Sequence, residues 1–536
     1  MNKSVTVIFR KVVIKIIATF IVGVMVIVVL SVNNQHRVLL AQSPPFPDSL
    51  DGIKLPPFIV EDNTPTTENH SCTMIVEPGK DVFVDGSSLS PGDTICLNAG
   101  EYWKLQLCFI NGADGNPIVV RNNGGKVIVK AGDGGSGGQW FSIEDSSNVR
   151  LTGTGDPNIK YGIYSITGLV SWNESTKIEV DHLELSGAWI NFSGSSDDPD
   201  FIEENYYIHH NYVYGHGASA IYLGEAHHAD QFVNKNCDIS YNIIVDSAWK
   251  GIQFKSSLEG GMLHHNFIYN TCFGPSDPSE FTSICAAINI THGSNVEVYN
   301  NVIIKNGSVG IIGGDSLYPH NIYNNLIVDM YKATGDGDAF LTWGGNYQIF
   351  NNTIVGAARF GINLDGSSGE NCSVFNNIIV DNSSDSIHFD GSPGEDFNSH
   401  YNLTKENGYT KDSVGFVKPT YDVSNYDYHL TEGSPAIDAG VIPSSVVDFD
   451  LVDDLEGAYR PKGTGYDIGA YEYVGEKPPI PGDLNNDEVV DIFDLVIVGN
   501  CFGREAVGDC ERADANDSGG IIDIFDLVMV GSHFGN

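Results

Sequence analysis

Oxygen-bearing side chains recur near the C-terminus at a spacing that suits a hard cation. The first group consists of Asp483, Asn485, Asp487, Asp491 and Asp494, with the backbone carbonyl of Val489 among them. The five side chains stand at the first, third, fifth, ninth and twelfth positions of one loop, the carbonyl stands at the seventh, and an apolar run follows. Because Ca²⁺ takes several oxygen ligands from one short turn, this spacing predicts a calcium-binding loop that leads into a helix.

A second copy of this pattern lies close to the end of the chain. The segment 491–499 recurs almost letter for letter as 523–531. The second group of candidate ligands is Asp514, Asn516, Ser518, Asp523 and Asp526. It holds one residue more between its first and last acids than the first group does. The sequence therefore predicts two loop–helix units, the second of them less regular.

Paired units of this kind resemble a type I dockerin, the module by which some extracellular enzymes and surface proteins bind a cohesin partner. The resemblance covers about Gly482 to Asn536 and implies a small all-α, calcium-binding domain. In that family the two residues after the ninth-position ligand contact the partner, and here they are the pairs 492–493 and 524–525, each Ile-Phe. Such apolar pairs would suit a partner surface or packing inside the module, and the calcium could also be purely structural.

Composition and the N-terminus limit the class of protein. The chain has 536 residues, a net charge of −41 and 41% hydrophobic residues, enough for one to three domains. An acidic surface repels nucleic acid and anionic membranes, so neither is expected as a partner. Basic residues from Lys3 to Lys15 precede the apolar run 16–32. This layout predicts a secretory signal over residues 1–41 or an uncleaved anchor, and in both cases an extracellular protein, secreted or attached to the cell surface.

The chain contains nine cysteines, which fits an oxidising compartment. Cys272 could pair with Cys285, and Cys501 with Cys510, because each pair brackets one segment. The odd count leaves at least one thiol free.

The centre of the chain repeats an Asn that is followed by a short apolar strand. The repeated residues are Asn211, Asn242, Asn266, Asn301, Asn325, Asn352, Asn377 and Asn402. Intervals mostly in the twenties predict a solenoid in which each coil covers the core of its neighbour. Asn tolerates the left-handed backbone of a tight corner, and its amide can bond the Asn one coil away.

The ends of the repeat resemble the opening coils and closing segments of secreted pectate-lyase-like proteins. The segments that carry this resemblance are residues 93–102 (DTICLNAGEY), 116–122, 428–440 (YHLTEGSPAIDAG) and 465–473. The resemblance implies an all-β, right-handed parallel β-helix over residues 72–474. Pro-rich linkers are expected on either side of it, at 42–71 and 475–481, and the dockerin-like domain follows at 482–536.

Alignment of the coils on the repeated Asn predicts which residues of the preceding strand face outward. The outward residues expected to contact substrate are Tyr222, Gln253, Asn289, Phe340, Asn363 and His388. Aromatic rings stack on pyranose rings and amides bond sugar hydroxyls, which favours a polysaccharide as the ligand. A solvated sheet face without a ligand would have a similar composition.

Lys255 stands in the same stripe and is the candidate for proton abstraction. Residues 252–257 (IQFKSS), followed one coil later by 290–295 (ITHGSN), resemble the alginate and chondroitin lyase family on this fold. The resemblance implies Lys255 as the base that removes the proton α to a uronate carboxyl, and His292 as part of the acid segment. Thr291 stands where that family has an arginine, and a surface lysine without a special role is the alternative.

Two further groups could carry chemistry. Asp365 and Asp390 take equivalent outward positions in neighbouring coils, about 4.8 Å apart by strand spacing. With Asp338 they form an acidic cluster that would serve a hydrolase or hold calcium. A histidine-rich set could bind a metal or simply face the turns, and its members are His209, His210, His227, His228, His264 and His265.

These patterns predict an exported, calcium-requiring protein that acts on polysaccharide, as a lyase or hydrolase, and docks to a cohesin-type partner or surface scaffold. A non-catalytic carbohydrate-binding or cell-surface adhesion protein is the alternative. Contact with a membrane is expected only if the N-terminal segment stays uncleaved.

Overall fold

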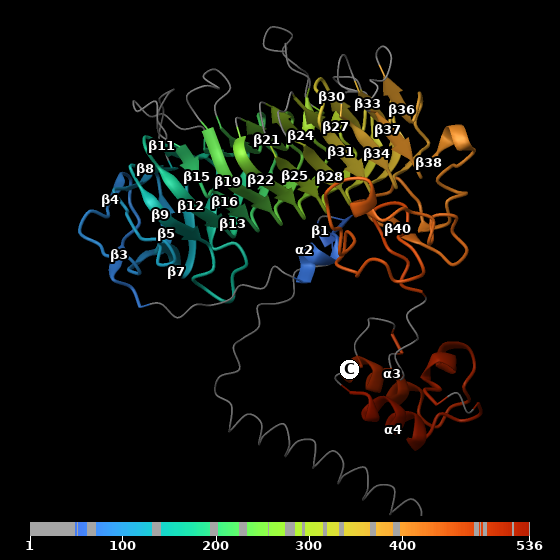
Figure 1. Cartoon of the computed structure of the whole chain (residues 1–536). Helices are drawn as coiled ribbons and strands as arrows, with labels where there is room; N and C mark the ends of the chain where they lie inside the picture. Colours follow the sequence, from blue (N-terminus) through green and yellow to red (C-terminus); the bar gives the residue numbers. More distant parts are fainter. Residues whose placement is uncertain are drawn as a thin grey trace, which may run out of the picture. The chain divides into compact units, whose positions relative to one another are not determined.

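The computed structural model of the chain contains a parallel β-solenoid and a small helical unit near the C-terminus (Figure 1). The two compact units are Met1–Tyr473 and Val474–Asn536. The structure describes residues 49–534 except 51, 62–70, 131–140, 193–201, 225–232, 256, 274–284, 292–294, 315–318, 332–336, 365–370, 390–396, 476–481, 483, 486–489 and 517–518. The expected signal or anchor, 1–41, therefore lies outside the described residues. Within the described ranges, every helix is too short or too polar to cross a membrane.

One face of the solenoid is a twelve-stranded parallel sheet. Its strands are β4 (Val82–Asp85), β6 (Leu105–Cys108), β8 (Phe141–Glu144), β11 (Leu169–Trp172), β14 (Ile190–Phe192), β18 (Ile221–Leu223), β21 (Ile252–Lys255), β24 (Ala286–Thr291), β27 (Val309–Gly313), β30 (Phe340–Thr342), β33 (Ile362–Leu364) and β36 (Ile387–Phe389). Each strand pairs in parallel with strands of the coils before and after it, as a solenoid requires.

The remaining faces form a 24-stranded sheet that bends along one line. In the first coils, β5 (Thr94–Tyr102) and β7 (Ile118–Val129) run through the bend. The strands before the bend are β3 (Met74–Val76), β9 (Ser147–Thr152), β12 (Thr176–Asp181), β15 (Ile202–Glu204), β16 (Tyr207–His209), β19 (Val233–Ser240), β22 (Ser257–His264), β25 (Val296–Tyr299), β28 (His320–Tyr323), β31 (Tyr347–Phe350), β34 (Ser373–Phe375) and β37 (Asn398–His400). Those after it are β10 (Ile163–Ser165), β13 (Leu183–Ser186), β17 (Tyr212–Tyr214), β20 (Ile243–Val245), β23 (Phe267–Tyr269), β26 (Val302–Ile304), β29 (Leu326–Met330), β32 (Thr353–Ala357), β35 (Ile378–Val380) and β38 (Leu403–Thr404).

The repeated asparagines lie at this bend and form the internal ladder that the sequence predicts. Asn301 is representative: its Oδ1 accepts from Nδ2 of Asn266, and its own Nδ2 donates to Oδ1 of Asn325, both at 3.0 Å. The same bond joins every successive pair of repeated asparagines. Buried amides are thereby satisfied from coil to coil, which holds the coils in register.

The left-handed residue at this corner is not the one that the sequence pattern suggests. The ladder asparagines keep a negative φ, and the residue immediately before each of them has a positive φ. Those residues are His210, Tyr241, His265, Asn300, Asn324, Asn351, Asn376 and Tyr401. The prediction that the ladder Asn itself adopts this conformation is therefore wrong by one position. The ladder Asn must instead aim its amide inward, toward the next coil.

The core runs the length of the solenoid and consists of the inward residues of all three rows of strands. Ile, Val, Leu and Phe dominate it, with Phe141, Phe254 and Ile288 among the residues buried there. Alternation along each strand places these side chains inside and their neighbours outside. The twelve-stranded sheet thus has one face in the core and one face directed outward.

A second apolar layer covers the outer face of the strands after the bend. Ile243, Val302 and Ile378 point outward there, yet they are buried against the segment that follows the last coil. That segment includes β39 (Phe416–Lys418), β40 (Asp427–Leu430) and the 3₁₀ turns Lys405–Asn407 and Pro443–Ser445. Strands buried on both faces explain the continuous apolar runs after each Asn.

Part of the expected N-terminal linker belongs to this layer as well. β1 (Ser49–Leu50), β2 (Ile53–Lys54) and α2 (Pro57–Glu61) form a short strap, and Ile59 is fully buried. Lys54 Nζ donates to the carbonyl of Tyr426 at 2.9 Å. The interpretation of 42–71 as one linker is therefore wrong for the strap, because its apolar side chains pack on the solenoid.

Three disulfides are present among the described residues. Cys272–Cys285 and Cys501–Cys510 match the predicted pairs, and Cys72–Cys96 joins them. Cys108, Cys237 and Cys372 stay buried as thiols.

The unit 474–536 contains two helices, α3 (Ile492–Cys501) and α4 (Ile524–Ser532), and the 3₁₀ turn Gly508–Ala513. Its small core includes Val490, Val498 and Val530. The Cys501–Cys510 disulfide links the end of α3 to the turn. The expected pair of helices after the two acidic loops is confirmed.

Candidate functional site

The outward face of the twelve-stranded sheet aligns one residue from each coil into a single row. This outward row runs through Asn191, Tyr222, Gln253, Asn289, Ile312, Leu341, Asn363 and His388. Neighbouring members are one strand apart, so the row crosses the strands along the solenoid. Five of the six residues predicted to contact substrate are members of it.

Phe340 is the exception, and its predicted outward orientation is wrong. Phe340 is 1% exposed and packs in the main core, while Leu341 pairs with Ile312 and Asn363 in the outward row. The stretch between strand and ladder Asn differs in length from coil to coil. Counting from the ladder therefore cannot decide which of two neighbouring residues points outward.

The outward row varies in character along its length. Gln253, Asn289 and Asn363 are buried amides, and Ile312 and Leu341 form a buried aliphatic cluster with Ala286 and Val309. Tyr222 and His388 stay partly exposed. The row therefore offers amides and rings near each end and an apolar centre.

Of the predicted catalytic residues, only Lys255 lies within the described part of the chain. Its Nζ is 5.5 Å from the centroid of the Tyr222 ring, so the cation lies over a neighbour in the outward row. His292, Asp365 and Asp390 lie outside the described residues.

Asp338, the third acid of the predicted cluster, is bound within an ion pair. Its carboxylate accepts from both Nε and a terminal nitrogen of Arg359, the former at 2.7 Å. It also accepts from the Phe360 N–H and from Nδ2 of Asn363, each at 3.1 Å. A carboxylate with this many donors is fully engaged in structure, which argues against a role as catalytic acid or calcium ligand.

The structure adds a lysine that the sequence pattern does not single out. Lys250 stands two residues before β21 and is 3% exposed, and its Nζ is 5.3 Å from the Trp249 ring centroid. Burial, with a smaller contribution from the nearby Lys255 charge, lowers the pKa of Lys250 to about 7. The available signal was a lysine at a corner position where the aligned coils carry alanine, serine, valine, aspartate or phenylalanine.

The four described histidines of the set, His209, His210, His264 and His265, lie at the ends of β16 and β22, outside the twelve-stranded sheet that carries the outward row. His209 Nε2 is 3.2 Å from Glu179 Oε1, and Glu179, Asp181 and His209 could together hold a metal ion. However, Arg150 Nε bonds both carboxylates, at 3.0 and 2.9 Å. Burial lowers the pKa of His209, but the Glu179 bond and the Asp181 charge outweigh it and raise the pKa above its usual value. The raised pKa favours the protonated imidazole, which, like the neighbouring guanidinium, competes with a bound cation.

His264 and His265 lie further along the solenoid, and His264 contacts one carboxylate. His264 Nε2 is 3.3 Å from Asp238 Oδ2, and the Nδ1 atoms of the two rings are 2.7 Å apart. His227 and His228 lie outside the described residues.

In the helical unit, seven of the predicted calcium ligands are described. They are Asn485, Asp491, Asp494, Asp514, Asn516, Asp523 and Asp526, while Asp483, Asp487, Val489 and Ser518 lie outside the described residues. Asp494 is fully buried, and its Oδ1 accepts from the N–H groups of Leu484 and Asn485 at 2.7 and 3.2 Å.

The same carboxylate ties the loop to helix α3. Its Oδ2 accepts from the Asp491 N–H at 2.8 Å, and Asp526 bonds the Asp523 N–H in the same way at the start of α4. Among the described residues, no basic side chain pairs with either of these buried carboxylates. Each stands at the end of an acidic loop, an arrangement that fits a hard divalent cation. Asn485, Asp491 and their counterparts would contribute further oxygens, and the ion would neutralise the loop charge.

The apolar pairs after the ninth-position ligands are on the surface of this unit. Ile492 and Phe493 are 52% and 63% exposed, and Ile524 and Phe525 are 46% and 66% exposed. Of the two predicted alternatives, packing inside the module is therefore wrong. The two helices instead present matching exposed pairs.

Comparison with known proteins finds similarity in fold only. No protein-family model matches the chain, and no curated protein sequence matches it. Among solved structures, the chain resembles a GH136 lacto-N-biosidase from Eubacterium ramulus with 11% identity and a TM-score of 0.42, covering 59% of this chain and 62% of that one. The chain thus spans less than two thirds of that enzyme's length.

Two lyase structures also resemble the chain. A pectate lyase has 16% identity and a TM-score of 0.35, covering 75% of this chain and 97% of that one. An alginate lyase from Paenibacillus sp. has 13% identity and a TM-score of 0.36, covering 62% and 99%. At these identities the similarity concerns the parallel β-solenoid and does not extend to activity.

Proposed function

We propose that the solenoid, as a right-handed parallel β-helix, binds a uronate-containing polysaccharide along the outward row and cleaves it by β-elimination. The observation that carries this proposal is the alignment of Tyr222, Gln253 and Asn289 in one row, with the Lys255 cation beside them. Rings and amides bind sugars, and a lysine amine is a suitable base for a proton next to a carboxyl group.

The roles follow the chemistry of elimination. A base removes the proton α to the uronate carboxyl, and the bond to the glycosidic oxygen breaks as a double bond forms. Lys255 is the base that the sequence suggests, and His292 is proposed as the residue that assists the departing oxygen. The second mechanism is hydrolysis by Asp365 and Asp390. Because Asp338 is held in an ion pair with Arg359, it is not proposed as a third catalytic carboxylate.

The test is mass spectrometry of the products formed by the full chain. The protein is incubated with alginate, polygalacturonate, chondroitin and neutral glycans, with Ca²⁺ and with chelator. Unsaturated fragments, each lighter by one water than a hydrolysis product, support the lyase. Fragments that have gained water support the hydrolase, and shift attention to Asp365 and Asp390.

A non-catalytic carbohydrate-binding or adhesion protein is the alternative from a different class. The buried aliphatic centre of the row, Ile312 and Leu341, is compatible with it because apolar groups bind sugar faces without chemistry. Polysaccharide that is bound but left intact in every condition would support this alternative and overturn the enzyme.

We further propose that the unit 474–536 is a calcium-loaded, dockerin-like module that binds a cohesin-type partner. The matching exposed pairs Ile492-Phe493 and Ile524-Phe525 support it. Titration calorimetry with cohesin modules is expected to give binding in Ca²⁺ and none in EGTA. Phe493→Asp combined with Phe525→Asp should weaken binding at least about 100-fold, as for loss of a central apolar anchor. Val507→Asp, at an exposed apolar position elsewhere on the unit, is the matched control.

Export completes the proposal. The three disulfides, placed in both units, fit an oxidising compartment outside the cytosol. N-terminal sequencing of the mature protein tests it, and a start near residue 42 is the expected result for cleavage of the proposed signal.

A further inference from the structure

A second line of residues runs beside the outward row, two positions before each strand of the twelve-stranded sheet. Its members include Ser219 before β18, Lys250 before β21, Asp338 before β30 and Phe360 before β33. We call this line the corner row. Its side chains lie next to the outward residues of the following coil.

Three members of the corner row engage the outward residue one coil further on, whereas Asp385, before β36, contacts His388 of its own coil. The Ser219 hydroxyl donates to Oε1 of Gln253 at 2.9 Å, and Asp338 accepts from Nδ2 of Asn363. The Phe360 ring stacks on the His388 ring, with centroids 3.9 Å apart and an angle of 3°. By this pattern, the partner of Lys250 is Asn289.

Lys250 and Asn289 are the corresponding pair, but no hydrogen bond joins them. Both residues are 3% exposed. The Asn289 Oδ1 is buried and has no hydrogen-bond partner among the described residues. Asn191 Oδ1 and Asn363 Oδ1 in the outward row also have no described hydrogen-bond partner, and Asn289 is the one that follows the Lys250 corner by strand register. Because buried polar groups are usually paired, an open acceptor of this row indicates a place that a ligand fills.

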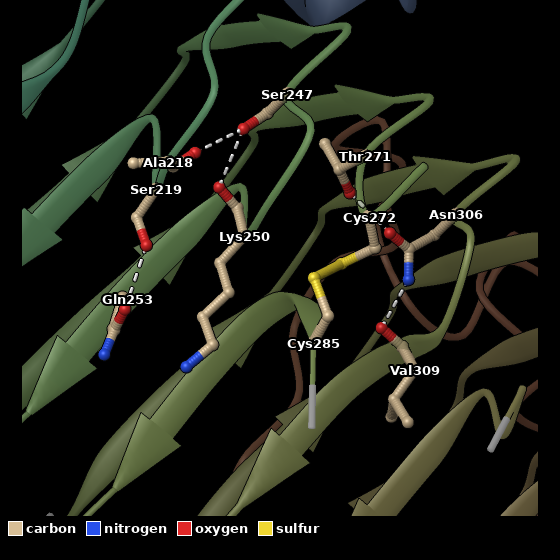
Figure 2. The surroundings of a disulfide bond; sticks show 10 residues. All are labelled: Ala218, Ser219, Ser247, Lys250, Gln253, Thr271, Cys272, Cys285, Asn306 and Val309. Carbon is tan, nitrogen blue, oxygen red and sulfur yellow. Dashed lines mark hydrogen bonds between the residues drawn. A yellow bond between two sulfur atoms is a disulfide. The ribbon is translucent and has the colours of Figure 1, made fainter. Parts of the chain in front are cut away.

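The backbone around Lys250 is held in place by several bonds. The Lys250 carbonyl accepts from the Ala220 N–H at 3.0 Å and from the Ser247 hydroxyl at 3.1 Å. The Cys272 N–H donates to the Trp249 carbonyl at 3.0 Å, and Cys272 is bonded to Cys285. In Figure 2 the side chains of Lys250 and Gln253 extend in the same direction from one coil. The amine is therefore presented from a rigid corner.

The charge state of the amine fits a proton acceptor. Lys255 is the one charged neighbour among the described residues that shifts the pKa of Lys250, and both burial and that charge favour the neutral amine. A neutral amine at neutral pH has a free lone pair, whereas an ordinary surface lysine is protonated.

We propose that Lys250 is the base of the elimination and that Asn289 Oδ1 accepts a hydrogen bond from a hydroxyl of the same sugar. This assignment rests on the lyase function proposed above and replaces Lys255 in that role. The Lys250 Nζ lone pair takes the proton from the carbon next to the carboxyl group, and the C–H electron pair becomes the new C=C bond. The bond to the glycosidic oxygen breaks, that oxygen takes a proton from water, and the ammonium returns its proton to solvent. Lys255 then serves as a cation for the sugar carboxylate.

The first experiment measures the amine without relying on activity. The folded full chain is treated with trace acetylating reagent over pH 5.5–11, and the rate at each lysine is followed by peptide mass spectrometry. The rate at Lys250 is expected to rise with a midpoint near pH 7, and that at exposed Lys418 with a midpoint near the ordinary value of about 10.4. A midpoint near 10 at Lys250 would overturn the proposal, because the amine would then be protonated at working pH.

The second experiment separates the two lysines by kinetics. Lys250→Ala should lower kcat by about 100-fold or more, the range expected for loss of a general base, with little change in KM. Lys255→Ala should mainly raise KM, and Lys418→Ala is the surface control. Asn289→Ala should raise KM and lower kcat without moving the pH midpoint.

Folding is controlled with a second variant of similar volume. Lys250→Met keeps the stem of the side chain, and its thermal transition and solenoid fluorescence report an intact fold. A Lys250→Met protein that is folded and eliminates at the wild-type rate would rule out the assignment. If wild-type protein gives no elimination on any polymer, the proposed lyase fails, and the assignment of Lys250 as its base fails with it. A normal elimination rate in Lys250→Met with loss in Lys255→Ala would overturn only the assignment.

Discussion

Arg359 holds the carboxylate of Asp338 with two nitrogen atoms, and the Asp338 side chain is completely buried. The guanidinium also lies over the Phe360 ring, with its carbon 4.9 Å from the centroid. This ion pair lies at the corner row, where one coil contacts the next. The ion pair therefore gives Asp338 a structural role, whereas the sequence pattern grouped it with Asp365 and Asp390 as a candidate catalytic acid.

Removing the cation of this pair should strongly destabilise the solenoid. Arg359→Leu leaves a buried carboxylate without its partner, and the expected loss in free energy of unfolding is about 3–5 kcal/mol. Urea unfolding followed by tryptophan fluorescence measures it. Arg504→Leu, at an exposed position in the helical unit, is the control and should leave the solenoid transition unchanged. If the solenoid unfolds at the same urea concentration in both variants, the Arg359–Asp338 ion pair does not stabilise it.

Replacing a single asparagine of the ladder should lower the free energy of unfolding of the solenoid. Asn301→Ala removes the acceptor of the Asn266 N–H and the donors to the carbonyls of Leu263 and Tyr299. Because buried groups are left unpaired, the expected loss is about 3 kcal/mol. Asn300→Gly changes the neighbouring left-handed residue and should cost under about 1 kcal/mol, since Gly adopts positive φ freely. A loss as large for Asn300→Gly as for Asn301→Ala would mean that corner conformation, and not the ladder, limits stability.

Stability should depend on pH through Lys250. Its folded pKa of about 7 lies below the unfolded value near 10.4, so the unfolded chain binds more protons between these two values. The free energy of unfolding should therefore rise with pH across this window, and the penalty is fully present below pH 7.

Replacing Lys250 with methionine is the direct check of this dependence. The variant should exceed wild type by about 4 kcal/mol at pH 7, and the difference should shrink toward zero near pH 10. Urea unfolding at pH 6.5, 8 and 9.5 provides the measurement. A difference that stays constant with pH would show that the two proteins differ in packing and that Lys250 keeps an ordinary pKa.

Removing calcium should unfold the unit 474–536 and leave the solenoid folded. Asp494 and Asp526 are buried carboxylates at the ends of acidic loops, and without the ion these loops repel one another. Hydrogen exchange of the full chain, read by mass spectrometry, should accelerate in α3 and α4 on addition of EGTA and stay slow in the ladder coils. Asp494→Ala should produce the same change in the presence of Ca²⁺. Unchanged protection of α3 and α4 in EGTA would contradict a calcium requirement.

Much of the fold follows from local regularities in the sequence. The repeated Asn predicted the coils and their internal ladder, because one amide per coil at near-constant spacing can bond only to its counterparts above and below. The two acidic loops predicted the positions of α3 and α4, since Asp491 and Asp523 cap these helices through their own side chains.

The candidate site was predicted in part. Tyr222, Gln253 and Asn289 fall in one row because their parallel strands pair in register and alternate residues of each strand face outward. Phe340 was misplaced by one residue, and Lys250 was not recognised, because both depend on the corners between strands. These corners vary in length, and nothing local in the sequence marks which side chain they turn outward.

By itself, then, the sequence determined the solenoid, its ladder and the two acidic loops that precede α3 and α4, all of which rest on short repeated spacings. Only the tertiary structure decided that Ile59 packs against the closing segment, that Arg359 forms an ion pair with Asp338, and that Lys250 is buried in the corner before β21. These relationships join residues that are distant in sequence or separated by corners of unequal length. Their energies come from burial and charge pairing, which exist only once the coils are stacked.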